Sequence, residues 1–261
     1  MFCYMHRLVE KGGKNPNVIY RTLDATFYKA LGWKEPRMIF TCSMSDFFLE
    51  KADQWRADAW DVIRKTPHHT WQILTKRPER IMQCLPPDWG DGWDNVWIGV
   101  SIENQKNFYR AVTLSKIPAK TRFISAEPLL GPLNLMPPEY GKSIINKFHW
   151  CIIGGESGND YGKYRYRNCK VEWIEQIIND LKHTTVAVFV KQMGTGLAKE
   201  MKLKDWHGGN MEEWPLHLCV RNYPSKKTSI QLRIKNSIQQ LLSFKAIINN
   251  LFKKSTNENT M

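Results

Sequence analysis

Long hydrophobic runs are missing from this 261-residue chain. None approaches the roughly 20 apolar residues that a membrane-spanning helix needs, which argues against a transmembrane protein. Cysteine is also sparse, because only six residues occur, at irregular spacings, and no apolar leader follows Met1. A secreted disulfide scaffold would carry a denser cysteine pattern. We therefore expect a protein of a reducing, cytoplasmic compartment with no membrane partner.

Acidic residues are in deficit, since 25 Asp and Glu stand against 38 Lys and Arg, for a net charge of +13. The segment 225–261 holds seven Lys and Arg against the single acid Glu258, so six of these charges lie there and seven in the rest. We expect a main domain at 1–224 and a basic tail at 225–261, either helical or disordered. The excess is compatible with a nucleic acid or nucleotide partner, and equally with a role in solubility alone.

Six short apolar runs have the length and composition of β-strands. They lie at 37–41, 70–74, 95–100, 121–124, 149–153 and 186–190. Segments with helical periodicity separate them, as at 53–64 and 171–181. Strands that alternate with helices predict an α/β fold with a parallel sheet.

Polar residues follow every one of these runs. The clusters begin at Cys42, Thr75, Ser101, Ser125, Gly154 and Lys191. In a parallel barrel or open sheet these positions share one face, where ligands bind. Helix capping and turns account for Ser45, Asp46, Asn104 and Pro128. Capping does not call for the charged residues at these ends, which are Lys76, Arg77, Glu127, Glu156 and Lys191.

We therefore predict a site in which Lys76, Glu127, Glu156 and Lys191 are the catalytic candidates. The two glutamates can act as acid and base, orient an amine, or ligate a metal, and the sequence leaves these alternatives open. The lysines supply positive charge for a carboxylate or a phosphate. Glycines at 154, 155 and 158 would let a ligand approach the backbone, although the spacing does not match the dinucleotide fingerprint.

Several longer motifs occur in a fixed order. They are Cys3-Tyr4, IFTCSMSDFF at 39–48, QILTKRPER at 72–80, VWIGVS at 96–101, FISAEPLLGP at 123–132 and IGGESG at 153–158. On these motifs the chain resembles, from Cys3 to about Pro224, the phage gene product thirty-seven/sixty-eight family, an uncharacterised family of phages, prophages and bacteria.

This resemblance implies a radical S-adenosylmethionine-like protein, that is, a partial TIM-like (β/α) barrel preceded by a three-cysteine loop. Three thiolates of such a loop hold a [4Fe–4S] cluster, whose open iron binds S-adenosylmethionine. Cys3 is the metal ligand that the resemblance implies here. The implied cofactor-binding residues are Cys3, Tyr4, Ser45, Asp46, Ser101, Glu103, Gly154, Gly155 and Ser157.

The chain departs from the family pattern at its beginning, because only the last cysteine of the loop is present, and the first barrel strand is missing as well. Either the coding sequence as given starts late, or the gene product is truncated or decayed, and we expect the chain as written to bind no cluster. The complete form is expected to be an enzyme that modifies nucleic acid or a nucleotide. The alternative is a non-catalytic nucleic-acid-binding accessory protein or a decayed gene fragment.

Overall fold

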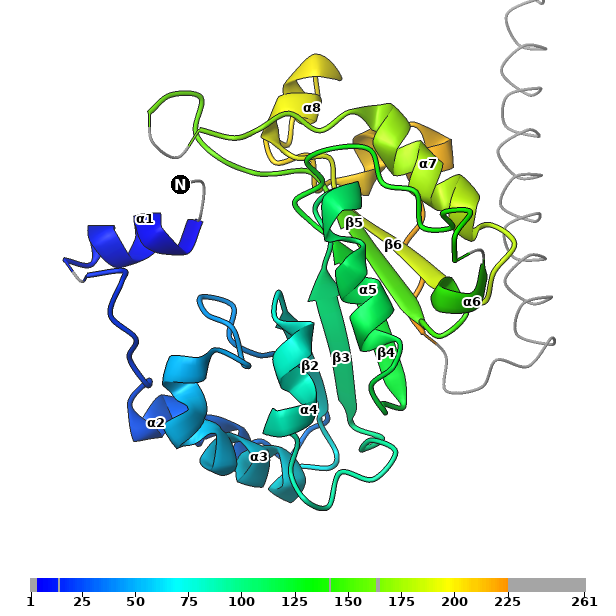
Figure 1. The fold of residues 1–261 in the computed structure, drawn as a ribbon. Helices are drawn as coiled ribbons and strands as arrows, with labels where there is room; N and C mark the ends of the chain where they lie inside the picture. Colours follow the sequence, from blue (N-terminus) through cyan, green and yellow to red (C-terminus); the bar gives the residue numbers. More distant parts are fainter. Residues whose placement is uncertain (1–3, 14, 141, 163–164, 225–261) are drawn as a thin grey trace, which may run out of the picture. The chain divides into compact units, whose positions relative to one another are not determined.

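The computed structural model describes residues 4–13, 15–140, 142–162 and 165–224, and Cys3 and the predicted tail at 225–261 lie outside them. Six strands of the described chain form one sheet. They are β1 (Met38–Phe40), β2 (Thr70–Thr75), β3 (Val96–Ser101), β4 (Thr121–Ala126), β5 (Trp150–Gly154) and β6 (Ala187–Gln192). Every neighbouring pair is parallel, and the strand order follows the chain (Figure 1). The sheet curls into a half-barrel, which confirms the predicted partial TIM-like α/β fold.

Helices occupy the segments between the strands. The α-helices are α1 (Tyr4–Lys11), α2 (Asp24–Phe27), α3 (Arg56–Lys65), α4 (Ile81–Cys84), α5 (Tyr109–Leu114), α6 (Lys142–Ile145), α7 (Val171–Leu181) and α8 (Thr195–Glu200). The 3₁₀ helices are η1 (Lys29–Gly32), η2 (Glu50–Trp55), η3 (Pro78–Arg80), η4 (Gln105–Asn107), η5 (Met211–Glu213) and η6 (Leu216–Leu218). None of the helices in the described part of the chain could cross a bilayer.

The predicted helix at 171–181 agrees with α7, but the one at 53–64 begins too early. The α-helix starts at Arg56, and η2 precedes it. The side chain of Arg56 is buried and donates hydrogen bonds to the carbonyls of Phe47 and Leu49. These bonds fix the start of α3 against the preceding loop, a constraint that helical periodicity does not reveal.

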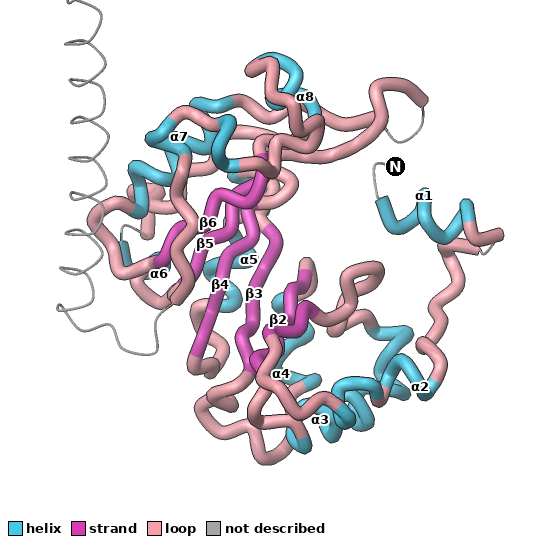
Figure 2. The backbone as a smooth tube through the Cα atoms, turned by 180° about the vertical axis from the view of Figure 1, so that it is seen from behind, coloured by secondary structure: helices cyan, strands magenta, loops and turns pink. Residues whose placement is uncertain are grey.

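The two faces of the sheet carry different residues, because side chains alternate along a strand. Ile98 and Ile124 belong to the main core, in which helices such as α5 and α7 pack on the sheet. Trp97, Phe123 and Trp150 form a separate cluster on the opposite, concave face. Figure 2 shows the strands from that side.

The two edges of the sheet differ. The edge strand β1 exposes about half of the Met38 and Phe40 side chains, so the half-barrel is open beside this strand, as predicted. The segment after η6 pairs with β6, because the N–H of Val190 donates to Val220 O and the N–H of Asn222 donates to Val188 O. The β6 edge is therefore covered by the chain itself.

Candidate functional site

Polar side chains lie at the carboxyl ends of the strands, above the aromatic cluster of the concave face. The alternation that places Trp97, Phe123 and Trp150 on this face also places the residues further along the same strands there. We call these residues the polar layer, and they are Lys76, Ser101, Glu103, Ser125, Glu127 and Lys191. Ser101, Glu103 and Ser125 are buried, whereas Lys76 and Lys191 are about half exposed. The layer thus combines buried hydroxyl groups with charges that solvent reaches.

Glu127 and Lys191 form an ion pair across the strand that separates them. Nζ of Lys191 donates to Oε1 of Glu127 at 2.8 Å, and the Glu127 side chain is 19% exposed. Gly154 of the intervening β5 lies beneath the carboxylate, since a Cβ at this position would be 3.1 Å from Cδ of Glu127. The glycine therefore leaves room for the carboxylate to reach Lys191.

Glu103 is the centre of a second ionic group. Nζ of Lys76 pairs with one carboxylate oxygen, while Asn107 and Arg110 donate to the other at 2.8 and 2.9 Å. The Arg110 guanidinium also donates to the carbonyl oxygen of Ser101. Two cations and an amide hold this buried carboxylate, which satisfies its hydrogen-bonding capacity.

The side chain of Glu156 is held by Arg167, a residue of the loop that follows β5. Its carboxylate accepts hydrogen bonds from the backbone N–H, the Nε and the Nη2 of Arg167, at 2.8, 2.9 and 2.5 Å. Bidentate pairing of this kind fixes the geometry of both partners. The role of Glu156 in this structure is to close the loop.

Asp46 ties the loop after β1 to the end of β2. One carboxylate oxygen accepts from the hydroxyl of Thr75 at 2.7 Å and from the backbone N–H of Phe48. The other accepts from the backbone N–H of Lys76 and from Arg77. Asp46 thus forms turn and loop contacts, as its capping interpretation predicts. Ser45 is exposed, and its N–H donates to the carbonyl of Cys42.

Gly155, the residue after β5, packs closely against another part of the chain. A Cβ on Gly155 would lie 2.0 Å from the carbonyl oxygen of Met193. The hydroxyl of Ser157 accepts a hydrogen bond from Gln192 at 2.9 Å, which also donates to the Gly155 carbonyl. This part of the predicted site is filled by the chain.

The chain matches, over residues 2–239, a family described as a protein of unknown function, DUF5131. It belongs to that family. Searches of the curated proteins and of the solved structures found no match. Membership of DUF5131 therefore assigns no activity to the chain.

Each of the four predicted catalytic residues of this DUF5131 protein forms an ion pair. Lys76 pairs with Glu103, Lys191 with Glu127, and Glu156 with Arg167. The expectation that each glutamate has a cationic partner agrees with these contacts. A cavity of about 620 Å³ does exist, but residues of α3 and of the α4 region line it, and none of the four predicted residues does.

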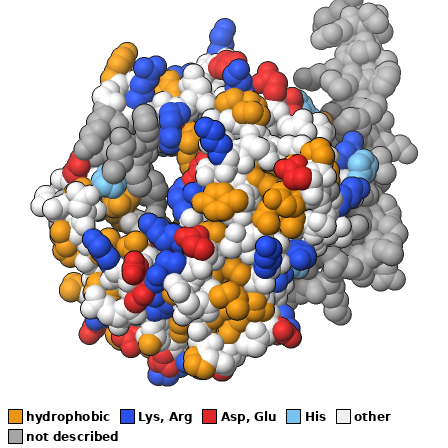
Figure 3. Space-filling view, viewed as in Figure 1, with side chains coloured by type: hydrophobic (Ala, Val, Ile, Leu, Met, Phe, Trp, Pro, Cys, Tyr) orange, Lys and Arg blue, Asp and Glu red, His pale blue; other side chains and the backbone are white. Residues whose placement is uncertain are grey.

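Three residues that hold the glutamates of the site were not selected from the sequence, namely Asn107 of η4, Arg110 and Arg167. Arg110 lies on α5 and Arg167 in the loop before α7, and neither follows a strand end. Charged residues on helices and in long loops are ordinarily solvated, so composition gave no reason to select them. On the face drawn in Figure 3, Lys and Arg side chains are interspersed with Asp and Glu side chains.

The cysteines of the described chain do not fit an iron–sulfur cluster. Cys42, Cys84, Cys151, Cys169 and Cys219 are all free thiols, and no group of three metal-ligating side chains occurs among the described residues. Burial raises the pKa of Cys169 to about 12 and also raises that of Cys151, which disfavours the thiolates that bind metals. Cys3 lies outside the described residues, and Tyr4 begins α1.

Proposed function

We propose that the polar layer binds S-adenosylmethionine and that this chain is the barrel part of a radical S-adenosylmethionine-like protein of phage or prophage type. The observation that carries the proposal is the Glu127–Lys191 pair over Gly154, at the carboxyl ends of a parallel half-barrel. In barrels of this kind ligands bind at that end of the strands. The family resemblance motivates the choice of ligand.

The chemistry of the ligand is complementary to these two residues. S-adenosylmethionine carries an ammonium, a carboxylate and a sulfonium group. Glu127 offers a carboxylate to the cationic groups, and Lys191 offers an ammonium to the anionic one. Because about half of the Lys191 side chain is exposed, the pair can exchange its mutual contact for contacts with a zwitterion at little desolvation cost.

The cluster that the resemblance implies has no fitting ligand set among the described residues. For the substrate, the net charge of +13 supports a nucleic acid or a nucleotide.

Isothermal titration of the purified protein with S-adenosylmethionine tests the proposal. We expect Glu127→Gln and Lys191→Gln to weaken binding at least tenfold, because each removes a charge-assisted hydrogen bond worth about 1.5–3 kcal/mol. Glu50→Gln and Lys182→Gln, at exposed positions away from the layer, are the matched controls and should bind as the parent does. No measurable binding by the parent, or equal losses in all four variants, would refute the proposal.

The same charge excess favours a second candidate, a non-catalytic nucleic-acid-binding accessory protein. This function requires oligonucleotide binding that is independent of S-adenosylmethionine. Fluorescence anisotropy of a labelled single strand, with and without S-adenosylmethionine, separates the two candidates. Strong binding that Glu127→Gln leaves intact would favour the accessory function.

A further inference from the structure

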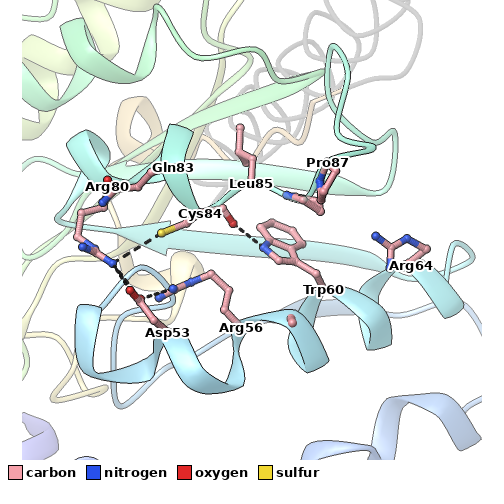
Figure 4. A pocket seen from close by; sticks show the side chains of 11 residues that line it. Asp53, Arg56, Trp60, Arg64, Arg80, Gln83, Cys84, Leu85 and Pro87 are labelled. Atoms are coloured by element: carbon pink, nitrogen blue, oxygen red, sulfur yellow. Dashed lines mark hydrogen bonds and ion pairs between the residues drawn. The ribbon is translucent and has the colours of Figure 1, made fainter.

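The cavity beside α3 satisfies its own polar groups. Its acid Asp53 accepts hydrogen bonds from both Arg56 and Arg80. Nε1 of Trp60 donates to the carbonyl of Cys84 at 2.8 Å and joins the two walls (Figure 4). The open edge of the sheet differs from this cavity, because the strand there has a neighbouring strand on one side only within the described chain.

The backbone of β1 presents hydrogen-bonding groups at this open edge. The carbonyl of Arg37 and the N–H of Thr41 bond to β2, the single neighbour of β1 in the described sheet. Because the backbone groups of successive residues turn to opposite sides of a strand, Ile39 also faces β2. Met38 and Phe40 turn their N–H and C=O groups the other way. Each of these two residues therefore offers one donor and one acceptor at the edge.

The side chains of the same two residues are apolar and exposed. Met38 is 49% exposed and Phe40 is 47% exposed. Phe40 is in register with Gln72, which lies on the concave face of β2, whereas Ile39 packs against the main core on the opposite face. Charged residues and proline ordinarily protect an edge strand, but residues 38–45 include neither. This edge is therefore a template for pairing with another strand.

The strand is complementary to a second copy of itself. In an antiparallel pair centred on Ile39, Met38 of each copy would lie opposite Phe40 of the other. Opposite residues of this kind exchange both of their N–H···O=C bonds, so the two Met38–Phe40 pairs would form four hydrogen bonds about a two-fold axis. Each methionine sulfur would also meet a phenylalanine ring, which is a favourable contact. Arg37 would lie opposite Thr41, so this register brings no like charges together.

We propose that β1 pairs with β1 of a second copy and that the protein forms a symmetric dimer through this edge. The pairing uses the same edge of both copies, and residues 220–222 cover the β6 edge, so the assembly closes at two chains. Met38 and Phe40 are the main side chains that it buries, so the interface is smaller than the roughly 1,200–2,000 Å² of a standard one, and the dimer is reversible at micromolar concentrations. The two polar layers lie at opposite ends of the dimer, which is independent of the proposed S-adenosylmethionine site.

Sedimentation velocity of the full 261-residue chain across a series of micromolar concentrations tests the dimer. We expect a monomer–dimer equilibrium without larger species. Met38→Glu and Phe40→Glu should weaken the dimer at least tenfold, because each places a charge against an apolar side chain of the other copy. The matched control is Met82→Glu on α4, where the methionine is 58% exposed, and it should change the affinity by less than twofold. Thermal unfolding of each variant separates loss of the dimer from loss of the fold.

Three results of this experiment would overturn the proposal. The first is a monomer at every concentration, and the second is an open-ended series of larger assemblies. The third is an equal loss of affinity in Met38→Glu and Met82→Glu. Because Glu127→Gln should leave the sedimentation profile unchanged, failure of the dimer and failure of the proposed function are distinguishable.

Cysteine cross-linking tests the register. Cys42 is an exposed free thiol, so the variants are made in a Cys42→Ser background. Ile39→Cys places two thiols opposite each other at the two-fold axis, with Cα atoms about 4.5 Å apart, a separation that a disulfide spans. We expect mild oxidation to cross-link this variant and to leave Thr41→Cys, two residues from the axis, without a cross-link. A cross-link at position 41 and none at position 39 would overturn the proposed pairing.

Discussion

The carboxylate of Glu127 reaches Lys191 by passing over Gly154, the last residue of β5. The oxygen and nitrogen atoms are 2.8 Å apart, and a Cβ at position 154 would lie 3.1 Å from Cδ of Glu127. A Cβ this close to Cδ would require the carboxylate of Glu127 to move by a few tenths of an ångström. The absence of a side chain at position 154 of β5 thus leaves room for the ion pair between Glu127, just past β4, and Lys191 of β6.

Replacement of this glycine tests that relationship. We expect Gly154→Ala to weaken S-adenosylmethionine binding several-fold while it lowers the free energy of unfolding by less than about 1 kcal/mol, because a side chain end can shift more easily than a packed core. Binding is measured by calorimetry and stability by urea unfolding. Unchanged binding together with unchanged stability would show that the position of Glu127 does not depend on Gly154.

A second glycine of the concave face is under tighter constraint. A Cβ on Gly99 would lie 2.4 Å from the ring of Phe123, which is fully buried. We expect Gly99→Ala to lower the free energy of unfolding by about 1–3 kcal/mol, the usual cost of overpacking. The control is Gly32→Ala, where a Cβ meets nothing within 4 Å, and where the change should be neutral or slightly stabilising. Equal urea midpoints for the two variants would contradict the packing argument.

The strands were predictable because their signal is local. Each predicted run agrees with a strand to within two residues at either end, as for 121–124 against β4 (Thr121–Ala126). Of the charged residues selected from the sequence, Lys76 and Glu127 lie just past β2 and β4, and Lys191 lies near the end of β6. What the sequence could not reveal was partner choice, since the pairing of Glu103 with Arg110, or of Glu156 with Arg167, depends on loop paths. The cavity beside α3 was missed for the same reason.

Acid should lower the free energy of unfolding through protonation of His69, which lies next to β1. Burial is the main reason that the pKa of His69 lies below its ordinary value of 6.5, and the ring is 1% exposed. Its Nδ1 accepts a hydrogen bond from the backbone N–H of Arg37 at 3.2 Å, next to β1. A protonated Nδ1 cannot accept this bond. The neutral form is therefore favoured in the folded state.

The sign of the pH effect follows from this shift. Above pH 6.5 the ring is mainly neutral in both states and contributes little pH dependence. As the pH falls below 6.5, the unfolded chain binds the proton before the folded chain does, so the free energy of unfolding decreases as the pH decreases. We expect His69→Asn, which keeps an acceptor near Nδ1, to lose less stability than the parent between pH 7 and pH 5. Urea unfolding across this range measures the difference. Parallel pH profiles for the two proteins would exclude His69 as the cause.

Iron binding by this chain is expected to be weak. A [4Fe–4S] cluster with one open iron needs three thiolates, and the described cysteines lie apart from one another, with two of them buried. After anaerobic reconstitution we expect far less than one cluster per chain and no visible charge-transfer absorption. Iron and sulfide assays measure this directly. Stoichiometric amounts of both would mean that the cysteines can be brought together.

Nucleic acid binding, if it is carried by the basic segment 225–261, should depend on salt and on that segment. The segment holds six of the thirteen net positive charges, and each phosphate contact contributes a slope of about 0.7–0.9 to the dependence of log K on log salt. Its deletion should make this slope shallower. We also expect the deletion to leave the unfolding temperature unchanged, because residues 220–222 already cover the β6 edge. Anisotropy titrations at several salt concentrations, with the parent and the deletion variant, test the first expectation, and thermal unfolding tests the second. An identical slope would locate the nucleic acid contacts on the half-barrel, and unfolding on deletion would show that the segment is part of its fold.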